Sequence, residues 1–145
     1  MDFMHVKRNE KIEYFMNMDK IVVVEFKAAY ETAAYAFFSI ADMADQIMIA
    51  RAEWDRIAPN FTSDRFFYVS ESDTHSFVIN KGRITHVEMN IGSFTYIYLD
   101  GRKDRLMLKP EVWAGVAGHF AHVPGAEGVL PAETVAKTEQ SPPAG

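Results

Sequence analysis

The stretch Ala36–Phe61, AFFSIADMADQIMIARAEWDRIAPNF, is the most informative part of the sequence, because the chain repeats its pattern 59 positions later. The second copy is Thr95–Phe120, TYIYLDGRKDRLMLKPEVWAGVAGHF, and the alignment needs no gap. Trp54 falls on Trp113, and the apolar positions around both tryptophans keep their register. An internal repeat constrains the whole architecture, so it is sought before any other assignment. The sequence therefore predicts two copies of one structural unit.

The residue pattern of each copy predicts strands that are followed by one helix. In the first copy, apolar residues at helical spacing follow Gln46–Ala50, and Pro59 limits the helix to residues 51–60. In the second copy, Pro110 suits the first position of a helix, where a missing N–H leaves no hydrogen bond unmade. Trp54 and Trp113 lie on the apolar stripes of these helices, and we expect both to be core residues.

Alternation of apolar and polar residues and a high content of β-branched residues predict the strands of both halves. In Lys20–Tyr30, for example, Val22, Val24 and Phe26 alternate with Val23 and Glu25. The expected strands span residues 11–18, 20–30, 33–40 and 46–50 in the first half, and 65–70, 76–80, 83–91, 93–100 and 105–109 in the second.

These elements predict an α+β fold. We expect two ββββα repeats with antiparallel sheets and one helix per repeat, packed as a pseudo-twofold domain, because each half alone leaves open sheet edges. The first repeat spans residues 10–61 and the second 62–122. Residues 1–9 are expected to be a flexible N-terminus. Residues 123–145, rich in Pro, Ala, Gly and Glu, are expected to be a disordered tail.

Composition narrows the function classes. The chain has no cysteine, which excludes disulfides, thiolate metal sites and thiol nucleophiles and fits a cytoplasmic protein. It shows no signal peptide and no membrane-length apolar run, so we expect no membrane partner. The formal net charge of −5 argues against a broadly cationic nucleic-acid binder, so local patches matter more than the total.

The residues between 93 and 100 carry the most functional information. Phe94, Tyr96 and Tyr98 alternate with aliphatic residues and point to one face of a strand. Aromatic rings on an open sheet face stack on unpaired bases, while cationic side chains follow the phosphates. The candidate nucleic-acid-binding residues are Phe94, Tyr96, Tyr98, Tyr35, Phe37, Lys27, His86, Arg83, Arg102, Lys103 and Arg105.

An alternative use of the same aromatic face is packing against the other half or a second subunit, because aromatics on sheets are more often buried. No motif for catalysis is present, and His119 and His122 lack partners at metal-ligand spacing. We therefore expect neither an enzyme nor a cofactor or metal site.

The segments IMIARAEWDRIAPNF (Ile47–Phe61) and LMLKPEVWAGVAGHF (Leu106–Phe120) resemble the strand-to-helix segment of the positive cofactor four, Whirly and PUR group. The resemblance covers residues 10–122 and implies two units in one chain that bind single-stranded DNA or RNA on a sheet surface. The chain carries fewer cations than that group does. Small residues such as Ala28 and Ala33 occupy the first unit, so the second unit is the better binding candidate.

Two function hypotheses follow. The leading one is a non-enzymatic single-stranded nucleic acid binder that forms a homo-oligomer, a dimer or higher. The alternative is a protein-interaction or inhibitor module, such as a phage-type accessory or counter-defence protein, that uses the aromatic face as a dimer or partner interface. The acidic residues of the tail, including Glu127, Glu133 and Glu139, are a candidate contact for a protein partner.

Overall fold

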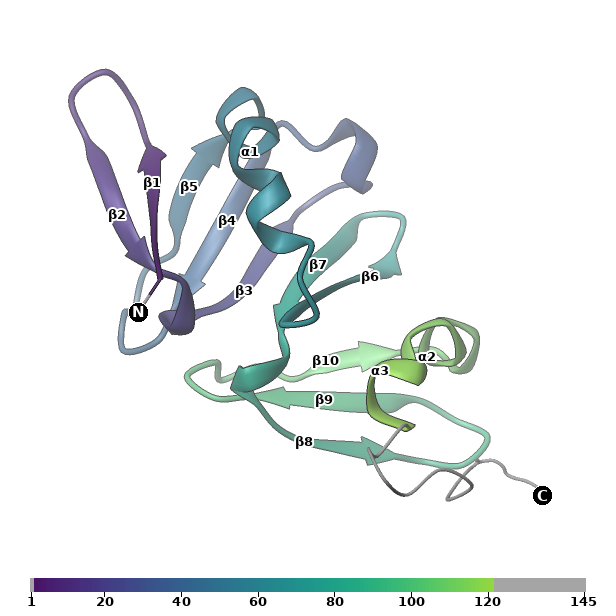
Figure 1. Ribbon diagram of the computed structural model, residues 1–145. Coiled ribbons are helices and arrows are strands. Elements are labelled where there is room, and N and C mark those ends of the chain that lie inside the picture. Colours follow the sequence, from purple (N-terminus) through teal and green to yellow (C-terminus); the bar gives the residue numbers. More distant parts are fainter. Residues whose placement is uncertain (1, 122–145) are drawn as a thin grey trace. The chain divides into compact units, whose positions relative to one another are not determined.

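The computed structural model describes residues 2–121, which fall into two compact units (Figure 1). Residues 2–109 hold ten strands and α1, and residues 110–121 hold α2 and α3. The tail expected at residues 123–145 lies outside the described residues, as does His122. The elements are β1 (Phe3–Lys7), β2 (Glu13–Asn17), η1 (Met18–Lys20), β3 (Ile21–Phe26), η2 (Tyr30–Thr32), β4 (Tyr35–Ile40), β5 (Ile47–Ala50), α1 (Arg51–Ile57), η3 (Ala58–Phe61), β6 (Phe66–Ser72), β7 (His75–Asn80), η4 (Lys81–Arg83), β8 (Ile84–Met89), β9 (Thr95–Leu99), β10 (Leu106–Leu108), α2 (Pro110–Val116) and α3 (Gly118–Ala121), where η marks a 3-10 turn.

The strands form three antiparallel sheets, which confirms the predicted α+β class. The sheets have the orders β1-β2, β5-β4-β3-β7-β6 and β10-β9-β8. Residues 1–9, expected to be a flexible N-terminus, contain β1 (Phe3–Lys7), which buries Met4 and Val6. Burial alternates along this short strand, with Met4 and Val6 in the core, and pairing with β2 makes it one strand of a hairpin.

The strands do not divide into one four-stranded sheet per half. Strands β6 and β7 belong to the second half of the chain, yet they join the sheet of the first half through the pairing of β7 with β3. Every residue of β3 is buried, and so is all of β7 except His75. A strand that is apolar on both faces requires a central position, and β3 and β7 provide it for each other. The predicted pseudo-twofold packing stays a prediction.

Strand order and register nevertheless recur along the chain. At an offset of 59 residues, β4, β5 and α1 correspond to β9, β10 and α2, and Phe37 faces Met48 just as Tyr96 faces Met107. At an offset of 63 residues, β1, β2, η1 and β3 correspond to β6, β7, η4 and β8. The change in offset falls in the β3–β4 and β8–β9 connections, which differ in length.

The register irregularity between β3 and β4 also recurs. The pairing steps from Ile21 opposite Ile40 to Val23 opposite Ser39. In the second copy it steps from Ile84 opposite Leu99 to His86 opposite Tyr98. These positions are related by the same two offsets, so even the β-bulge is shared between the copies.

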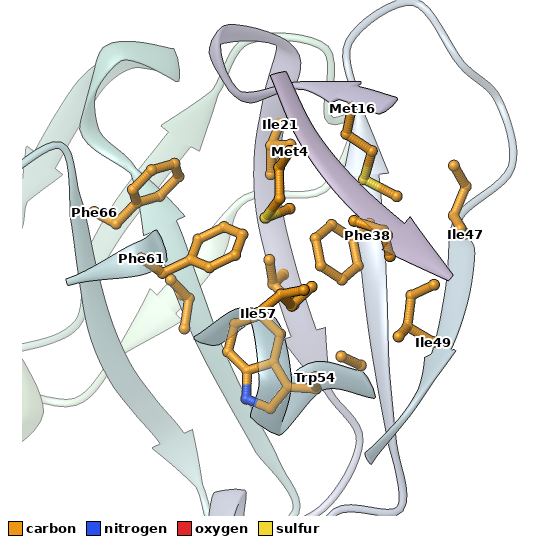
Figure 2. Packing of buried hydrophobic residues seen from close by; sticks show 14 of the residues in the cluster. Met4, Met16, Ile21, Phe38, Ile47, Ile49, Trp54, Ile57, Phe61 and Phe66 are labelled. Atoms are coloured by element: carbon orange, nitrogen blue, oxygen red, sulfur yellow. The ribbon is translucent and has the colours of Figure 1, made fainter. Parts of the chain in front are cut away.

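The main core lies between α1, the β1–β2 hairpin and one face of the five-stranded sheet (Figure 2). Trp54 is 1% exposed, which confirms its predicted core role, and its ring lies 5.0 Å from that of Phe61. The indole Nε1 of Trp54 donates to the hydroxyl of Tyr30 at 2.9 Å, so its polar atom is satisfied. Trp113 is only half-buried, and its ring stacks 5.4 Å from that of Phe120.

Helix α1 also anchors β1 through two polar contacts. A carboxylate oxygen of Glu53 accepts from the backbone N–H of Lys7 at 2.7 Å. Arg56 pairs with Glu53 and donates to the carbonyl of His5 at 3.0 Å. The hydrogen bond from Arg56 lowers the pKa of Glu53 from 4.5 to about 2, and the bond from Lys7 acts in the same direction. The ionised form of Glu53 therefore stabilises the attachment of the hairpin.

Candidate nucleic-acid interface

The outer face of the three-stranded sheet is defined here by His86 and Glu88 of β8, Tyr96 and Tyr98 of β9, and Arg105 immediately before β10. The opposite face of β9 is apolar and buried, as alternation requires. His86 faces Tyr98 and Glu88 faces Tyr96 across the β8–β9 pair. Strand register therefore brings His86, Glu88, Tyr96 and Tyr98 together, and Arg105 joins them from the position before β10.

The rings and the guanidinium on this face form a stacked group. The guanidinium carbon of Arg105 lies 3.8 Å from the ring centre of Tyr96 and 5.9 Å from that of Tyr98. The imidazole of His86 stacks on Tyr98 with ring centres 4.3 Å apart and planes inclined by 11°. Arginine over an aromatic face is attracted by the ring quadrupole. The group is thus arranged before any ligand arrives.

Hydrogen bonds also join Tyr98 of this group to its neighbours Arg105 and Glu88. The hydroxyl of Tyr98 accepts from Nη1 of Arg105 at 2.9 Å and donates to Oε1 of Glu88 at 3.2 Å. The bond to Tyr98 raises the pKa of Arg105 above its ordinary value, so the guanidinium stays charged. Arg105, His86 and Glu88 are exposed, whereas Tyr96 and Tyr98 are half-buried. The face can offer the exposed imidazole of His86, the planar cation of Arg105 and the carboxylate of Glu88 to a ligand, with the half-buried tyrosine rings against them.

Phe94 lies apart from this group. It precedes β9, is half-buried, and its carbonyl accepts from Asn90. Within residues 2–121 its ring makes no contact with the tyrosines of the outer face. The strand begins at Thr95, two residues later than the sequence predicted, so Phe94 lies outside the β8–β9 ladder.

Tyr35, Phe37 and Lys27 form a separate cluster on the five-stranded sheet. The ammonium of Lys27 lies 4.2 Å from the ring centre of Phe37, and the rings of Tyr35 and Phe37 are 6.4 Å apart. Phe37 corresponds to Tyr96 at the offset of 59, so both copies place a cation over the same ring position. Strand register accounts for the equivalent rings, whereas the two cations come from different places in the repeat: Lys27 follows β3 and Arg105 precedes β10.

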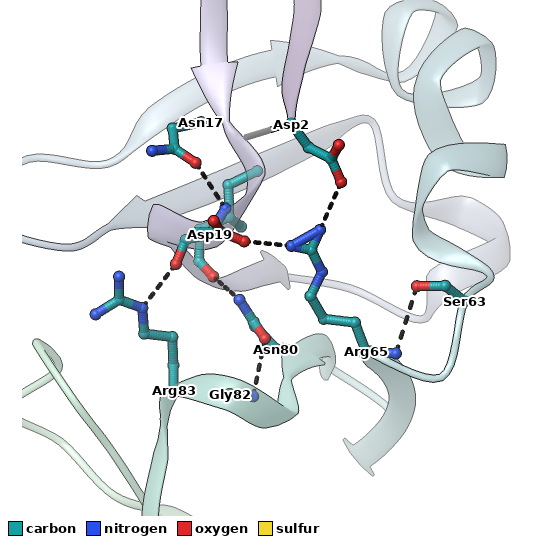
Figure 3. Close-up of polar contacts among 9 residues, drawn as sticks. Asp2, Asn17, Asp19, Ser63, Arg65, Asn80, Gly82 and Arg83 are labelled. Atoms are coloured by element: carbon teal, nitrogen blue, oxygen red, sulfur yellow. Dashed lines mark hydrogen bonds and ion pairs between the residues drawn. The ribbon is translucent and has the colours of Figure 1, made fainter.

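The guanidinium of Arg83 makes two structural hydrogen bonds. Its Nη1 donates to Oδ2 of Asp100 at 2.8 Å, and its Nε donates to the carbonyl of Asp19 at 2.8 Å (Figure 3 shows the second contact). Its side chain is only 18% exposed. A phosphate would have to displace these partners to reach the guanidinium.

Arg102 and Lys103 line a cavity of about 360 Å³ next to the β4–β5 and β9–β10 turns, and Lys27 lies at the same cavity. Three carboxylates also line it, so cations and anions balance: Glu25, Asp45 and Asp104. Arg102 lies 3.8 Å from Oε1 of Glu25. The cavity is therefore not a cationic pocket for phosphate.

Two acidic residues of these faces were not among the candidates from the sequence. Glu88 bonds to Tyr98, and Glu25, only 8% exposed, accepts from Gln46 at 3.0 Å. They occupy equivalent positions at the offset of 63. The one charged residue in the apolar run IVVVEF was the available signal for Glu25.

Across the described part of the chain, no three His, Cys, Asp or Glu residues are placed to hold a metal ion. None of its helices is long and apolar enough to span a membrane.

Comparison with known proteins gives one informative likeness. No protein-family model matches the chain, and no curated protein matches it. A solved structure of the LytTr DNA-binding domain of a putative methyl-accepting/DNA response regulator from Bacillus cereus superposes with a TM-score of 0.53. The match covers 84% of this chain and 99% of that domain at 12% sequence identity. The two proteins therefore share a fold.

Proposed function

We propose that the protein is a non-enzymatic nucleic acid binder that takes single-stranded DNA or RNA on the outer face of β8–β10. The observation that carries the proposal is the stack of Arg105 over Tyr96, with His86 on Tyr98 beside it. Unpaired bases stack on such planar groups, each contributing about 1–3 kcal/mol. Arg105 would extend the stack or meet a phosphate.

The shared fold supports the proposal in part. The superposable Bacillus cereus domain is named for DNA binding, so the fold accommodates a nucleic-acid ligand in at least that protein. Fold alone does not determine function, and the argument for this chain rests on its own outer face.

The charge distribution predicts weak salt dependence. Arg83 and Arg102 are engaged by Asp100 and Glu25, which leaves Arg105 as the cation of the outer face. Each phosphate contact to a single strand contributes about −0.7 to the slope of log affinity against log salt. We expect one or two such contacts and a correspondingly shallow slope, with stacking as the main source of affinity.

Fluorescence anisotropy tests the proposal. Labelled single-stranded DNA, single-stranded RNA and duplex DNA would be titrated with the protein at two salt concentrations. We expect the single strands to bind more tightly than the duplex. The replacement Tyr96→Ala should weaken single-strand binding about 5- to 160-fold, the factor for the loss of one stacked base.

The matched control is Phe37→Ala, at the equivalent position of the first copy. It should leave affinity unchanged if only the second copy binds. Equal affinity of wild type and Tyr96→Ala, with both variants folded by circular dichroism, would refute the stacking site. Tighter binding of the duplex would instead move the proposal to double-stranded DNA.

A protein-interaction module is the second candidate. The exposed carboxylate of Glu88 on the outer face and the net charge of −5 favour a partner other than a polyanion. In that case none of the three probes would bind even at low salt. A Glu88→Gln variant separates the two functions, because removing this charge should strengthen nucleic-acid binding and weaken binding to a basic protein surface.

A further inference from the structure

The two halves of the chain are joined by one strand pair, β3 with β7. In that pair Val24 lies opposite Val78, and Glu25 lies opposite Phe77. The pair converts the strands β5-β4-β3 of the first copy and β7-β6 of the second into one five-stranded sheet. Through this pair, strands from one copy of the repeat extend the sheet of the other copy.

The reciprocal contact is not made within residues 2–121. The counterpart of β3 is β8, and the counterpart of β7 is β2. Strand β8 is the last strand of its sheet, and β2 pairs with β1 alone. The sheets β10-β9-β8 and β2-β1 thus correspond, strand for strand, to the two parts that β3 and β7 join in the five-stranded sheet.

We infer that β8 is the docking edge for β2 of a second copy of this chain. The β3–β7 pair supplies the register, because the same offset of 63 relates both partners to their counterparts. Val87 would lie opposite Phe15 of the second copy, and Glu88 opposite its Tyr14. Glu25 opposite Phe77 and Glu88 opposite Tyr14 then place a glutamate across from an aromatic ring in both sheets.

Asn17 provides independent support (Figure 3). Its counterpart Asn80 uses both ends of its amide: Oδ1 accepts from Gly82, and Nδ2 donates across the β3–β7 junction to the carbonyl of Ile21 at 2.9 Å. Oδ1 of Asn17 likewise accepts from Asp19 at 3.0 Å, but its Nδ2 has no partner within residues 2–121. In the inferred pairing that N–H would donate to the carbonyl of Ile84 in the second copy.

Exposed apolar side chains mark the same two edges. Phe15 on β2 is 72% exposed and Met89 on β8 is 53% exposed. An exposed edge strand with apolar side chains is a template for pairing with another chain. The inferred register brings Phe15 beside Val87 and Met89, so docking covers the surfaces that the isolated chain leaves to water.

The pairing joins two different surfaces and is therefore head-to-tail. Such contacts give rings when the rotation between copies closes, and open chains when it does not. This inference concerns strand edges and does not rest on the nucleic-acid proposal, which concerns the outer face.

Paired cysteines test the register directly, because the protein has none of its own. Full-length Phe15→Cys and Val87→Cys variants would be mixed and oxidised, and the mass of the product measured. Residues directly opposite lie about 4.5–5.5 Å apart between Cα atoms, within disulfide range. We expect a mixed disulfide dimer. Phe15→Cys with Met89→Cys, displaced by two residues to about 7–8 Å, should crosslink at least tenfold more slowly.

Sedimentation then tests the assembly. The wild type should exceed the monomer mass of 16.5 kDa as its concentration rises from micromolar to about millimolar. Phe15→Lys should return it to the monomer without changing the far-UV spectrum, whereas the control Met48→Lys, at a position 43% exposed on β5, should not. A wild-type monomer throughout this range, or equal crosslinking of the two cysteine pairs, would overturn the inference.

Discussion

Asp42 and Gly101 occupy the same place in the two copies, and both have a backbone φ in the left-handed region, 70° and 79°. The first lies in the β4–β5 turn and the second in the β9–β10 turn. Glycine adopts this conformation without strain, and aspartate is among the few other residues that tolerate it. The two turns have therefore kept one backbone geometry with different residues.

This equivalence predicts the order of two substitutions at position 101. Gly101→Ala should lower the free energy of unfolding by about 1–2 kcal/mol through backbone strain. Gly101→Asp should lower it less, because the equivalent turn already carries aspartate. Urea denaturation of the three proteins measures both values. The opposite order would show that contacts with neighbouring atoms determine the loss of stability, and not the backbone φ. One such contact lies between the added Cβ and the Cα of Ala41, at 3.6 Å.

The two equivalent asparagines should differ in their effect on stability. Asn80 is 2% exposed and makes two hydrogen bonds to backbone groups. Asn80→Ala would leave the carbonyl of Ile21 without its side-chain donor and should cost about 1–3 kcal/mol. Asn17→Ala should cost less in a dilute monomeric sample, because only one bond is lost there. Thermal unfolding at low protein concentration compares them, and equal losses would contradict the expectation.

Acid should weaken the attachment of β1 to α1 through Glu53. The folded-state pKa of about 2 lies below the ordinary value of 4.5, so the stabilisation is fully present above pH 4.5 and is lost as the pH falls towards 2. In Glu53→Gln this part of the acid dependence should be absent. Unfolding free energies at pH 6 and pH 3 should therefore differ less in the variant, and an unchanged difference would show that other carboxylates account for it.

The hydrogen bond between Trp54 and Tyr30 predicts a small, separable loss of stability. Tyr30→Phe keeps the ring that packs 4.9 Å from Phe26 but leaves the buried indole N–H without its acceptor. The expected cost is about 1–3 kcal/mol. Denaturation monitored in a Trp113→Phe background reports on Trp54 alone. A stability equal to that of the parent would indicate that water replaces the hydroxyl.

Much of the fold was predictable, because alternation identifies strands such as β9 and β10 and the repeat marks the helices. Pairing between β3 and β7 was not predictable, since it joins residues far apart in sequence and depends on both strands being apolar on two faces. At the outer face, the sequence identified Tyr96, Tyr98 and Arg105, which strand register brings together. The sequence could not show that Arg83 pairs with Asp100 or that Arg102 pairs with Glu25.

The position of β3 between β4 and β7 makes the two copies interdependent. Cutting the chain at residues 62–65 and keeping the two fragments apart would expose β3, which is buried along its whole length. Two fragments made from that break should each aggregate when expressed alone and regain a common fold when produced together. Deleting either half would expose a central strand that the other half covers.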